Sequence, residues 1–517
     1  MTIWELITQI VLAFRPVCTR PEPFAWLVVA ILGIMCRSDS YGSASSIRSM
    51  EIDGRHYGAF LNFFRSTAIS LPDLRKVWCK VLFKFAMPYK EGNSCVGLID
   101  HTKKSKEGRK SPGVKRHTQE SETQSKAKHI FGYLFGGLSI VIGCATKADV
   151  LIAIPLILQL QCGIKCIKEW SEDDYSSLCP NDQNIVKKLN KIVKDLEIST
   201  ESYITQMVLL AINVAEWAEI NLIIVADRAF LTIKCVSAIQ LHNLSPKGKY
   251  KVQIVTRARN NTVAYPCCPS TLSTAKRNAA KRHLSQMFDM DTRTLRRYIG
   301  SHDKSIVWRR KDLNMYGKTE DVHFVAVDLY WKEGIKLRFV FVKYGDKKTI
   351  LVSTDCSLDA EAIIRLYCCR EKIECNFREL NQVVNAFSSR FWSPSMPKLN
   401  RFSKSTDPDP LEKITDRKER LHIASCVRAI QIYAAIACIS LGIMQIISVS
   451  FVWSSDDFRW QRTPTSIDRP SEACIQEYLQ GRIMFKMIRN PQNEIGALLK
   501  KWLAKPTEEK DDKTMAS

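Results

Sequence analysis

The chain has 517 residues, and 76 Lys and Arg side chains against 53 Asp and Glu give it a formal net charge of +23. A hydrophobic fraction of 45% and a charged fraction of 25% are those of a globular protein, which argues against disorder, and the length suffices for about two to four domains. The positive surplus favours a polyanionic partner such as nucleic acid, with membrane-surface binding as the main alternative.

The 18 cysteines indicate neither a disulfide framework nor a zinc site. They are scattered along a long chain, and no second pair of ligands lies near Cys162 and Cys166. Reduced thiols are the simpler interpretation, and we expect a cytoplasmic protein.

Three apolar segments raise the question of a membrane span. Residues 23–36 and 150–164 are too short to cross a bilayer, whereas residues 429–455 are uncharged and long enough. Residues 1–36 do not form a good signal peptide, because Glu5 precedes the first Arg. For residues 429–455 we expect a buried core helix followed by an irregular segment, with a membrane protein as the alternative.

The N-terminal third is predicted to change from helix to strand. Residues 1–90 carry apolar side chains at helical spacing, interrupted by a Ser-rich break at 38–49. The apolar run 94–99 predicts a buried strand that ends at Asp100. A basic segment follows from Lys103 to Lys128, and the Gly-punctuated residues 131–146 predict a hairpin beside the first strand.

The rest of the chain is predicted to be mixed. Residues 182–217 are expected to be helical, and the apolar run 221–227 to form a second buried strand ending at Asp227. Further strands are predicted at 251–258, 322–331, 335–344 and 347–355, with a hairpin turn at 332–334. A helix is predicted from 358 to about 384, with Ser357 or Asp359 as its N-cap. Residues 401–416 are expected to form a linker or exposed loop, and the tail after Lys505 to be disordered.

Two strands that end in Asp, followed by a helix that carries Glu374, supply three carboxylates that can converge on one edge of a sheet. Hard divalent cations prefer oxygen ligands, and two of them about 3.5–4 Å apart can catalyse phosphoryl displacement. The pattern alone is only suggestive, since an Asp at a strand end is more often a turn residue. On the predicted helix, Tyr367, Arg370 and Glu374 recur at steps of three and four, which places them on one face; a solvated polar stripe is the alternative.

This segment resembles the Tyr-(2)-Arg-(3)-Glu-(6)-Lys signature of bacterial insertion-sequence transposases of the DDE superfamily. The sequence NLIIVADRAF around Asp227 resembles the second-aspartate strand of these enzymes, and GLIDHTKK around Asp100 resembles the first. The resemblance covers roughly residues 94–440, is most specific in the helix, and is weakest at Asp100. The signature lysine falls on Asn381, which departs from the pattern; Arg378 is a possible substitute for its charge.

The resemblance implies a role for each matched residue. Asp100, Asp227 and Glu374 would hold Mg²⁺ or Mn²⁺, two ions in all, and Tyr367 and Arg370 would contact DNA phosphate near the cleaved end. Further DNA-binding candidates are Arg378, Asn381, Arg228, Lys103 and Lys104. Trp308 or Trp331 could stack on an unpaired base and His129 could face the site, although a structural role is the simpler interpretation of all three.

These observations predict an α/β fold, in which a ribonuclease-H-like mixed sheet with flanking helices is interrupted by a β-rich insertion. The expected parts are a helical N-terminal region that recognises DNA ends (1–90), the catalytic domain (91–245 and 347–460), the insertion (246–346) and a C-terminal region (461–517). The expected function is metal-dependent cleavage of double-stranded DNA at element ends, followed by strand transfer, by a homodimer away from any membrane. The alternative is a decayed or repurposed transposase that only binds DNA.

Overall fold

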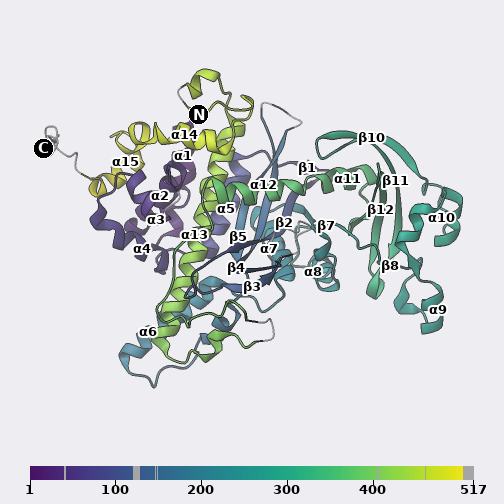
Figure 1. Ribbon diagram of the computed structural model, residues 1–517, viewed down its shortest axis with the longest axis horizontal. Coiled ribbons are helices and arrows are strands. Elements are labelled where there is room, and N and C mark those ends of the chain that lie inside the picture. The colour runs from purple at the N-terminus through teal and green to yellow at the C-terminus, as the bar shows by residue number, and fades with distance from the viewer. Residues whose placement is uncertain are drawn as a thin grey trace.

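A mixed sheet of 11 strands runs through the part of the chain that the structure describes (Figure 1). This computed structural model describes residues 1–39, 42–119, 128–145, 147, 150–403, 407–459 and 461–504. Figure 1 shows helices α1 to α4, α14 and α15 at one end of the molecule, the sheet in the middle and the segment with β10 to β12 at the other end. The coarse expectation of an α/β protein with a mixed sheet and flanking helices is confirmed.

Five strands make up the centre of the sheet, in the order β5-β4-β2-β6-β7. Strands β4 and β5 continue antiparallel from β2, whereas β6 is parallel to β2 and β7 is parallel to β6. Two short strands, β1 (Lys90–Glu91) and β3 (Lys115–Thr118), pair with β2 and β4. The bounds of the five central strands are β2 Ser94–Ser105, β4 His129–Gly143, β5 Leu151–Leu160, β6 Asn221–Ala226 and β7 Val252–Arg257.

The β-rich segment extends the same sheet instead of forming a separate one. Strand β13 (Lys347–Ser353) pairs with β7, and β12 (Lys336–Tyr344), β11 (Lys318–Tyr330) and β10 (Arg309–Met315) follow in antiparallel order. Alternate residues of β12 enter different cores, since Val340 and Val342 join the main core whereas Phe339 and Phe341 join a second one. The second core also contains side chains from α10 (Thr292–Ile299). Helix α9 (Thr274–Ala279) and the two-stranded sheet of β8 (Val263–Ala264) and β9 (Arg282–His283) complete this segment.

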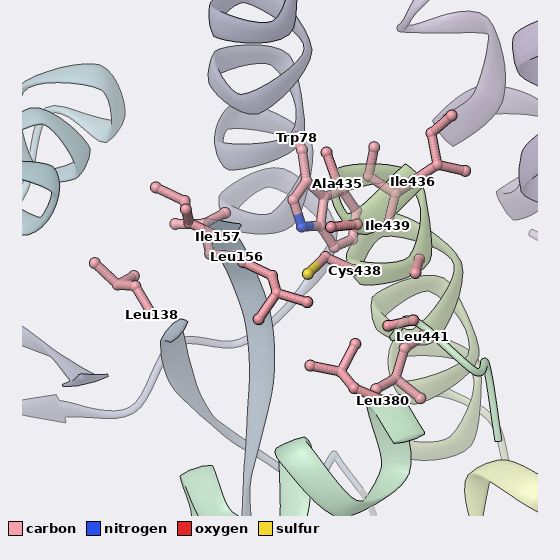
Figure 2. Close-up of a cluster of buried hydrophobic side chains, with 14 of the residues drawn as sticks. Trp78, Leu138, Leu156, Ile157, Leu380, Ala435, Ile436, Cys438, Ile439 and Leu441 are labelled. Carbon is pink, nitrogen blue, oxygen red and sulfur yellow. The ribbon is translucent and has the colours of Figure 1, made fainter. Parts of the chain in front are cut away.

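Helix α13 (Arg417–Ser450) is the centre of the main core. Its most apolar 18-residue window has a mean hydropathy of 2.1 and is 100% buried by surrounding protein. Figure 2 shows Trp78, Leu156 and Leu380 gathered around its residues 435–441. A side chain at Gly442 would overlap the Trp78 ring, so this glycine allows the tryptophan to pack against the helix. The expected buried core helix is therefore present, although it begins before residue 429 and ends at Ser450.

The remaining helices surround α13 and cover the sheet. Buried Arg428 of α13 forms a 2.9 Å ion pair with Asp195 of α6, whose carboxylate also accepts a hydrogen bond from the Leu71 backbone N–H of α5. The bounds are α1 Ile3–Leu12, α2 Pro21–Cys36, α3 Ser43–Ser49, α4 Tyr57–Arg65, α5 Leu71–Phe85, α6 Pro180–Leu196, α7 Tyr203–Ala218, α8 Ile233–Leu244, α11 Ala360–Cys368, α12 Glu371–Gln382, α14 Glu472–Gln480 and α15 Glu494–Leu499.

Several expected elements need correction. Residues 131–146 do not form a hairpin, because 129–143 are the single strand β4, paired on both sides; residue 146 lies outside the described residues. The Ser-rich break contains helix α3, and the helix expected at 182–217 is divided where Glu197 adopts a left-handed φ of 46°. The boundary expected at 246 assigned β7 to the insertion, but β7 pairs with β6 in the central sheet. The tail after Lys505 and residues 404–406 of the expected linker also lie outside the described residues.

Candidate functional site

Asp100 and Asp227 follow matched positions on neighbouring parallel strands. The last paired residues of β2 and β6 are Ile99 and Ala226, so the two aspartates come next on both strands. Asp227 follows the end of β6 as expected, but β2 does not end at Asp100: it continues to Ser105 through its pairing with β4. Both aspartates are half-buried at the point where the two strands separate.

Glu374 and Arg370 are brought to these aspartates by the junction of α11 and α12. The helix expected at 358–384 is interrupted after Cys368, where the N–H groups of Cys369 and Arg370 donate to carbonyls three residues back. From this junction the Arg370 guanidinium reaches two carboxylates, with Nη2 3.2 Å from Asp100 Oδ2 and Nη1 3.0 Å from Glu374 Oε1. Asp359 is the N-cap of α11, one of the two residues expected there.

The charges of these groups affect one another. Burial raises the pKa of Asp100 to about 6; Arg370 and the His101 backbone N–H oppose the shift, whereas the charges of Asp227 and Glu374 add to it. Burial also lowers the pKa of the Arg370 guanidinium, but nearby negative groups, Asp100 first among them, more than offset this. Asp100 and Glu374 therefore share the Arg370 guanidinium, and Asp227 lies near enough to affect the pKa values of Asp100 and Arg370.

Packing against β4 holds α12 at this position. Gly137, the register partner of Asp100, has no side chain, and a Cβ there would lie 2.5 Å from the Phe377 ring of α12. The neighbouring Asn376 is buried, and its amide donates to Ser139 Oγ of β4 at 2.9 Å and accepts from Gln445 of α13 at 3.1 Å. Because these contacts involve buried groups on three elements, α12 is attached to both the sheet and the core helix.

His101, which was not predicted from the sequence, follows Asp100 directly and belongs to the surroundings of the carboxylates. Its Nε2 lies 3.1 Å from Gln161 Oε1 and 3.2 Å from the Tyr203 carbonyl oxygen, and its ring stacks on Phe230 at 5.4 Å. Burial lowers the pKa of His101 to about 4, partly offset by these two hydrogen bonds. The imidazole is therefore neutral at pH 7 and supports the strand next to Asp100.

Tyr367 connects the carboxylates to the β-rich segment. It lines a cavity of about 230 Å³ together with Tyr316, Tyr344, Arg257 and Lys347. Tyr316 lies in the two-residue turn between β10 and β11 and has a left-handed φ of 56°, a conformation that is costly for a residue with a Cβ. Burial raises the pKa of Tyr316, as it does that of Tyr367. Tyr316 and Arg257 were not predicted from the sequence; the pair Tyr316-Gly317, just before the β-rich run at 322–331, was the available signal.

The other predicted DNA-binding residues lie on accessible surface around the site. Lys103 is exposed and donates to the Thr118 carbonyl oxygen at 2.6 Å, and the Lys104 ammonium lies 4.8 Å from the centre of the Phe387 ring. Arg228 and Asn381 are exposed. Arg378 is also exposed, and its Nε lies 3.2 Å from Glu379 Oε1.

Three weaker candidates do not join the carboxylates. His129 pairs with Thr118 at the start of β4, eight residues from Gly137 and therefore about 27 Å along the strand from the position beside Asp100. Trp331 is buried in the second core. Trp308 is half-buried and donates to the Met290 carbonyl oxygen at 3.0 Å. Both tryptophans therefore have the structural packing role that was the simpler interpretation of the sequence.

Comparison with known proteins identifies no relative: no family model, no curated protein and no solved structure matches the chain. Among the described residues, no group of three or more His, Cys, Asp or Glu side chains is assembled closely enough to hold a metal ion. Arg370 contacts two of the three predicted ligands. The residues present nevertheless fit a hard divalent cation in kind, because all three are carboxylates and supply oxygen ligands.

Proposed function

We propose that this chain is a DNA transposase of the DDE type, with Asp100, Asp227 and Glu374 as its metal ligands and a ribonuclease-H-like catalytic domain. The observation that carries the proposal is the cluster in which Arg370 bridges Asp100 and Glu374 while Asp227 follows the matched position on the next strand. The order of the central strands supports the fold assignment, because three antiparallel strands are followed by two parallel ones.

The proposed chemistry divides between the carboxylates and the residues around them. Mg²⁺ or Mn²⁺ bound by the carboxylates would activate the attacking oxygen and stabilise the leaving oxygen. The Arg370 guanidinium has the two-pronged geometry that suits a phosphate oxyanion, and it would exchange Asp100 for the DNA backbone. Tyr367, one turn before Arg370 in the sequence, would contact the same strand. Neutral His101 would keep β2 in place beside Asp100.

Cleavage of DNA tests the proposal directly. A supercoiled plasmid that carries the DNA flanking the gene would be incubated with the full-length chain in Mg²⁺ or Mn²⁺. We expect nicking by the unaltered chain, its loss in Asp227→Asn and Glu374→Gln, and little change in DNA binding. Glu371→Gln is the matched control, because Glu371 is an exposed carboxylate in the same helical turn. Undiminished nicking by either ligand variant removes that residue from the site.

A second candidate function is a transposase that has lost catalysis and only binds DNA. The observation in its favour is Asn381, an exposed neutral residue where the resembled signature has lysine. Tight DNA binding without nicking by the unaltered chain would favour it. The proposed enzyme would act as a homodimer on two DNA ends, in the cytoplasm.

A further inference from the structure

A cavity of about 550 Å³ lies between the end of α4, the surface of α6, the start of α13 and residues 392–394. Its lining includes Arg65, Lys188, Trp392, Ser393 and His422. None of the described residues that line it is acidic. The volume is within the range of about 300–1,000 Å³ typical of small-molecule sites. It is formed by elements that do not carry the predicted metal ligands.

Trp392 presents the largest exposed apolar side chain in the lining of this cavity. Its side chain is 57% exposed, whereas its neighbours Phe391 and Ser393 are only 5% and 2% exposed. Of the tryptophans that the structure describes, Trp392 alone is mostly exposed. An exposed indole held between two buried residues presents a flat apolar ring to solvent at a fixed position.

The basic segment after Asp100 holds the Trp392 segment in place. The Ser393 N–H donates to the Lys110 carbonyl oxygen at 3.1 Å, and Lys110 Nζ donates to the Pro394 carbonyl oxygen at 3.0 Å. The Ser111 hydroxyl donates to the Phe391 carbonyl oxygen at 2.9 Å. Contacts on both sides of Trp392 limit the movement of its backbone, so the ring loses little further freedom when a ligand stacks on it.

The polar groups of the cavity suit an anion. Arg65 and Lys188 are exposed cations, and the buried Ser393 hydroxyl has no hydrogen-bond partner among the described residues. A flat ring beside two cations and a free hydroxyl is the combination that binds one nucleotide, with the base on the indole and the phosphate on the cations. A purely apolar ligand would give Arg65 and Lys188 no negatively charged group to contact.

We propose that this cavity binds a nucleotide of an unpaired DNA strand, whose base stacks on Trp392 while Arg65 and Lys188 contact the adjacent phosphate. The inference rests on the proposed function in one respect, since that function supplies DNA as the polyanion. An unpaired strand is required because a base inside a duplex has no free face for the indole.

Tryptophan fluorescence of the full-length chain, titrated with oligo(dT) in EDTA, measures this binding without cleavage. We expect quenching in the unaltered chain and loss of most of the quenching in Trp392→Ala, with affinity about 5- to 150-fold weaker, the range that one base–aromatic stack supplies. Trp392→Phe should bind more tightly than Trp392→Ala when affinity is measured by the anisotropy of a labelled oligonucleotide. Phe485→Ala, which alters an exposed aromatic residue outside the cavity, should have no effect.

The charge contribution has its own control. Lys187 and Lys188 are adjacent exposed residues of α6, but only Lys188 lines the cavity, so Lys188→Gln should weaken oligo(dT) binding more than Lys187→Gln. Equal effects of these two variants, or unchanged affinity in Trp392→Ala, would overturn the proposal. Thymidine monophosphate that binds as tightly as oligo(dT) would also overturn it, by assigning the cavity to a free nucleotide.

The outcome is distinguishable from a failure of the proposed function. Asp227→Asn should retain the quenching, because Asp227 does not line the cavity. Quenching without any nicking would leave this inference standing and remove the enzyme. Nicking by the unaltered chain together with unchanged oligo(dT) affinity in Trp392→Ala would support the proposed enzyme and overturn this inference.

Discussion

Replacing Asp100 by Asn is expected to stabilise the metal-free protein at neutral pH. The carboxylate is mostly buried, with 18% of its side chain exposed, and it lies near the negative charges of Asp227 and Glu374. One ion pair with Arg370 does not offset these costs, because the pKa of Asp100 remains raised from 3.8 to about 6. The amide of Asn is nearly isosteric and carries no charge, so the substitution removes the cost of ionisation.

The size and pH dependence of the effect follow from linkage. A carboxyl whose pKa is higher in the folded state contributes stability that is fully present below pH 3.8 and is lost as pH rises to about 6. At about 1.36 kcal/mol for each pH unit, the loss approaches about 3 kcal/mol at pH 7.5 and is about 1.5 kcal/mol at pH 5. Asp100→Asn should therefore gain up to about 1.5 kcal/mol more over the unaltered chain at pH 7.5 than at pH 5.

The neighbouring His101 titrates with the opposite sign and supplies the control. The pKa of His101 falls from 6.5 to about 4 on folding, so its contribution is present above pH 6.5 and is lost as pH falls toward 4. The two contributions oppose each other between about pH 4 and 6 in the unaltered chain. In Asp100→Asn the His101 contribution remains, so the free energy of unfolding should rise with pH over this range. In His101→Gln the Asp100 contribution remains, so the free energy of unfolding should fall as pH rises.

Urea denaturation at intervals from pH 5 to pH 8, in EDTA, measures these differences. The decisive quantity is the change in the free energy of unfolding between each variant and the unaltered chain. If Asp100→Asn is less stable than the unaltered chain at pH 7.5, the ion pair with Arg370 outweighs the cost of burying the Asp100 charge, and the predicted stabilisation is wrong.

Three further predictions concern the helix that carries Glu374. Asn381→Lys should keep or raise the nicking rate, because a cation at this position would add a charge-assisted contact with DNA phosphate worth about 1.5–3 kcal/mol. Arg378→Ala should reduce the nicking rate only if Arg378 already supplies this positive charge in the unaltered chain. Gly137→Ala should cost about 1–3 kcal/mol of stability by overpacking against α12 and should slow nicking, whereas Gly143→Ala, with open space on the same strand, should do neither. Arg370→Gln should bind Mn²⁺ more tightly than the unaltered chain when free Mn²⁺ is measured by electron paramagnetic resonance without DNA, because its ion pairs with Asp100 and Glu374 would no longer compete with the metal. Equal or weaker Mn²⁺ binding would show that these ion pairs do not compete with the metal.

The sequence predicted secondary structure correctly where a local apolar pattern coincided with burial, as in β6 and α13. The run before Asp227 is apolar on both faces, which is typical of a central parallel strand, and β6 ends where the pattern ends. Helix α13 contains a similarly apolar stretch, and its most apolar 18-residue window is 100% buried.

The features that the sequence did not predict depend on contacts between distant segments. Strand β2 continues through polar residues after Asp100 because β4 supplies hydrogen-bond partners as far as Ser105, which hydropathy cannot indicate. The interruption at Arg370 contains neither Gly nor Pro, so no local residue signals it. The burial of His101 depends on Tyr203 and Phe230, which lie more than 100 residues later in the chain.

The contacts of Arg370 explain why the three predicted ligands do not form an assembled metal site among the described residues. The Arg370 guanidinium contacts Asp100 and Glu374 together and so supplies a counter-charge to both carboxylates. A metal ion held by Asp100 and Glu374 would compete with the Arg370 guanidinium for both carboxylates, and a DNA phosphate would be an alternative partner for the guanidinium. If the proposed function is correct, DNA binding would therefore favour metal binding, because the phosphate would take the Arg370 guanidinium away from the carboxylates. By the same linkage, metal binding would favour DNA binding.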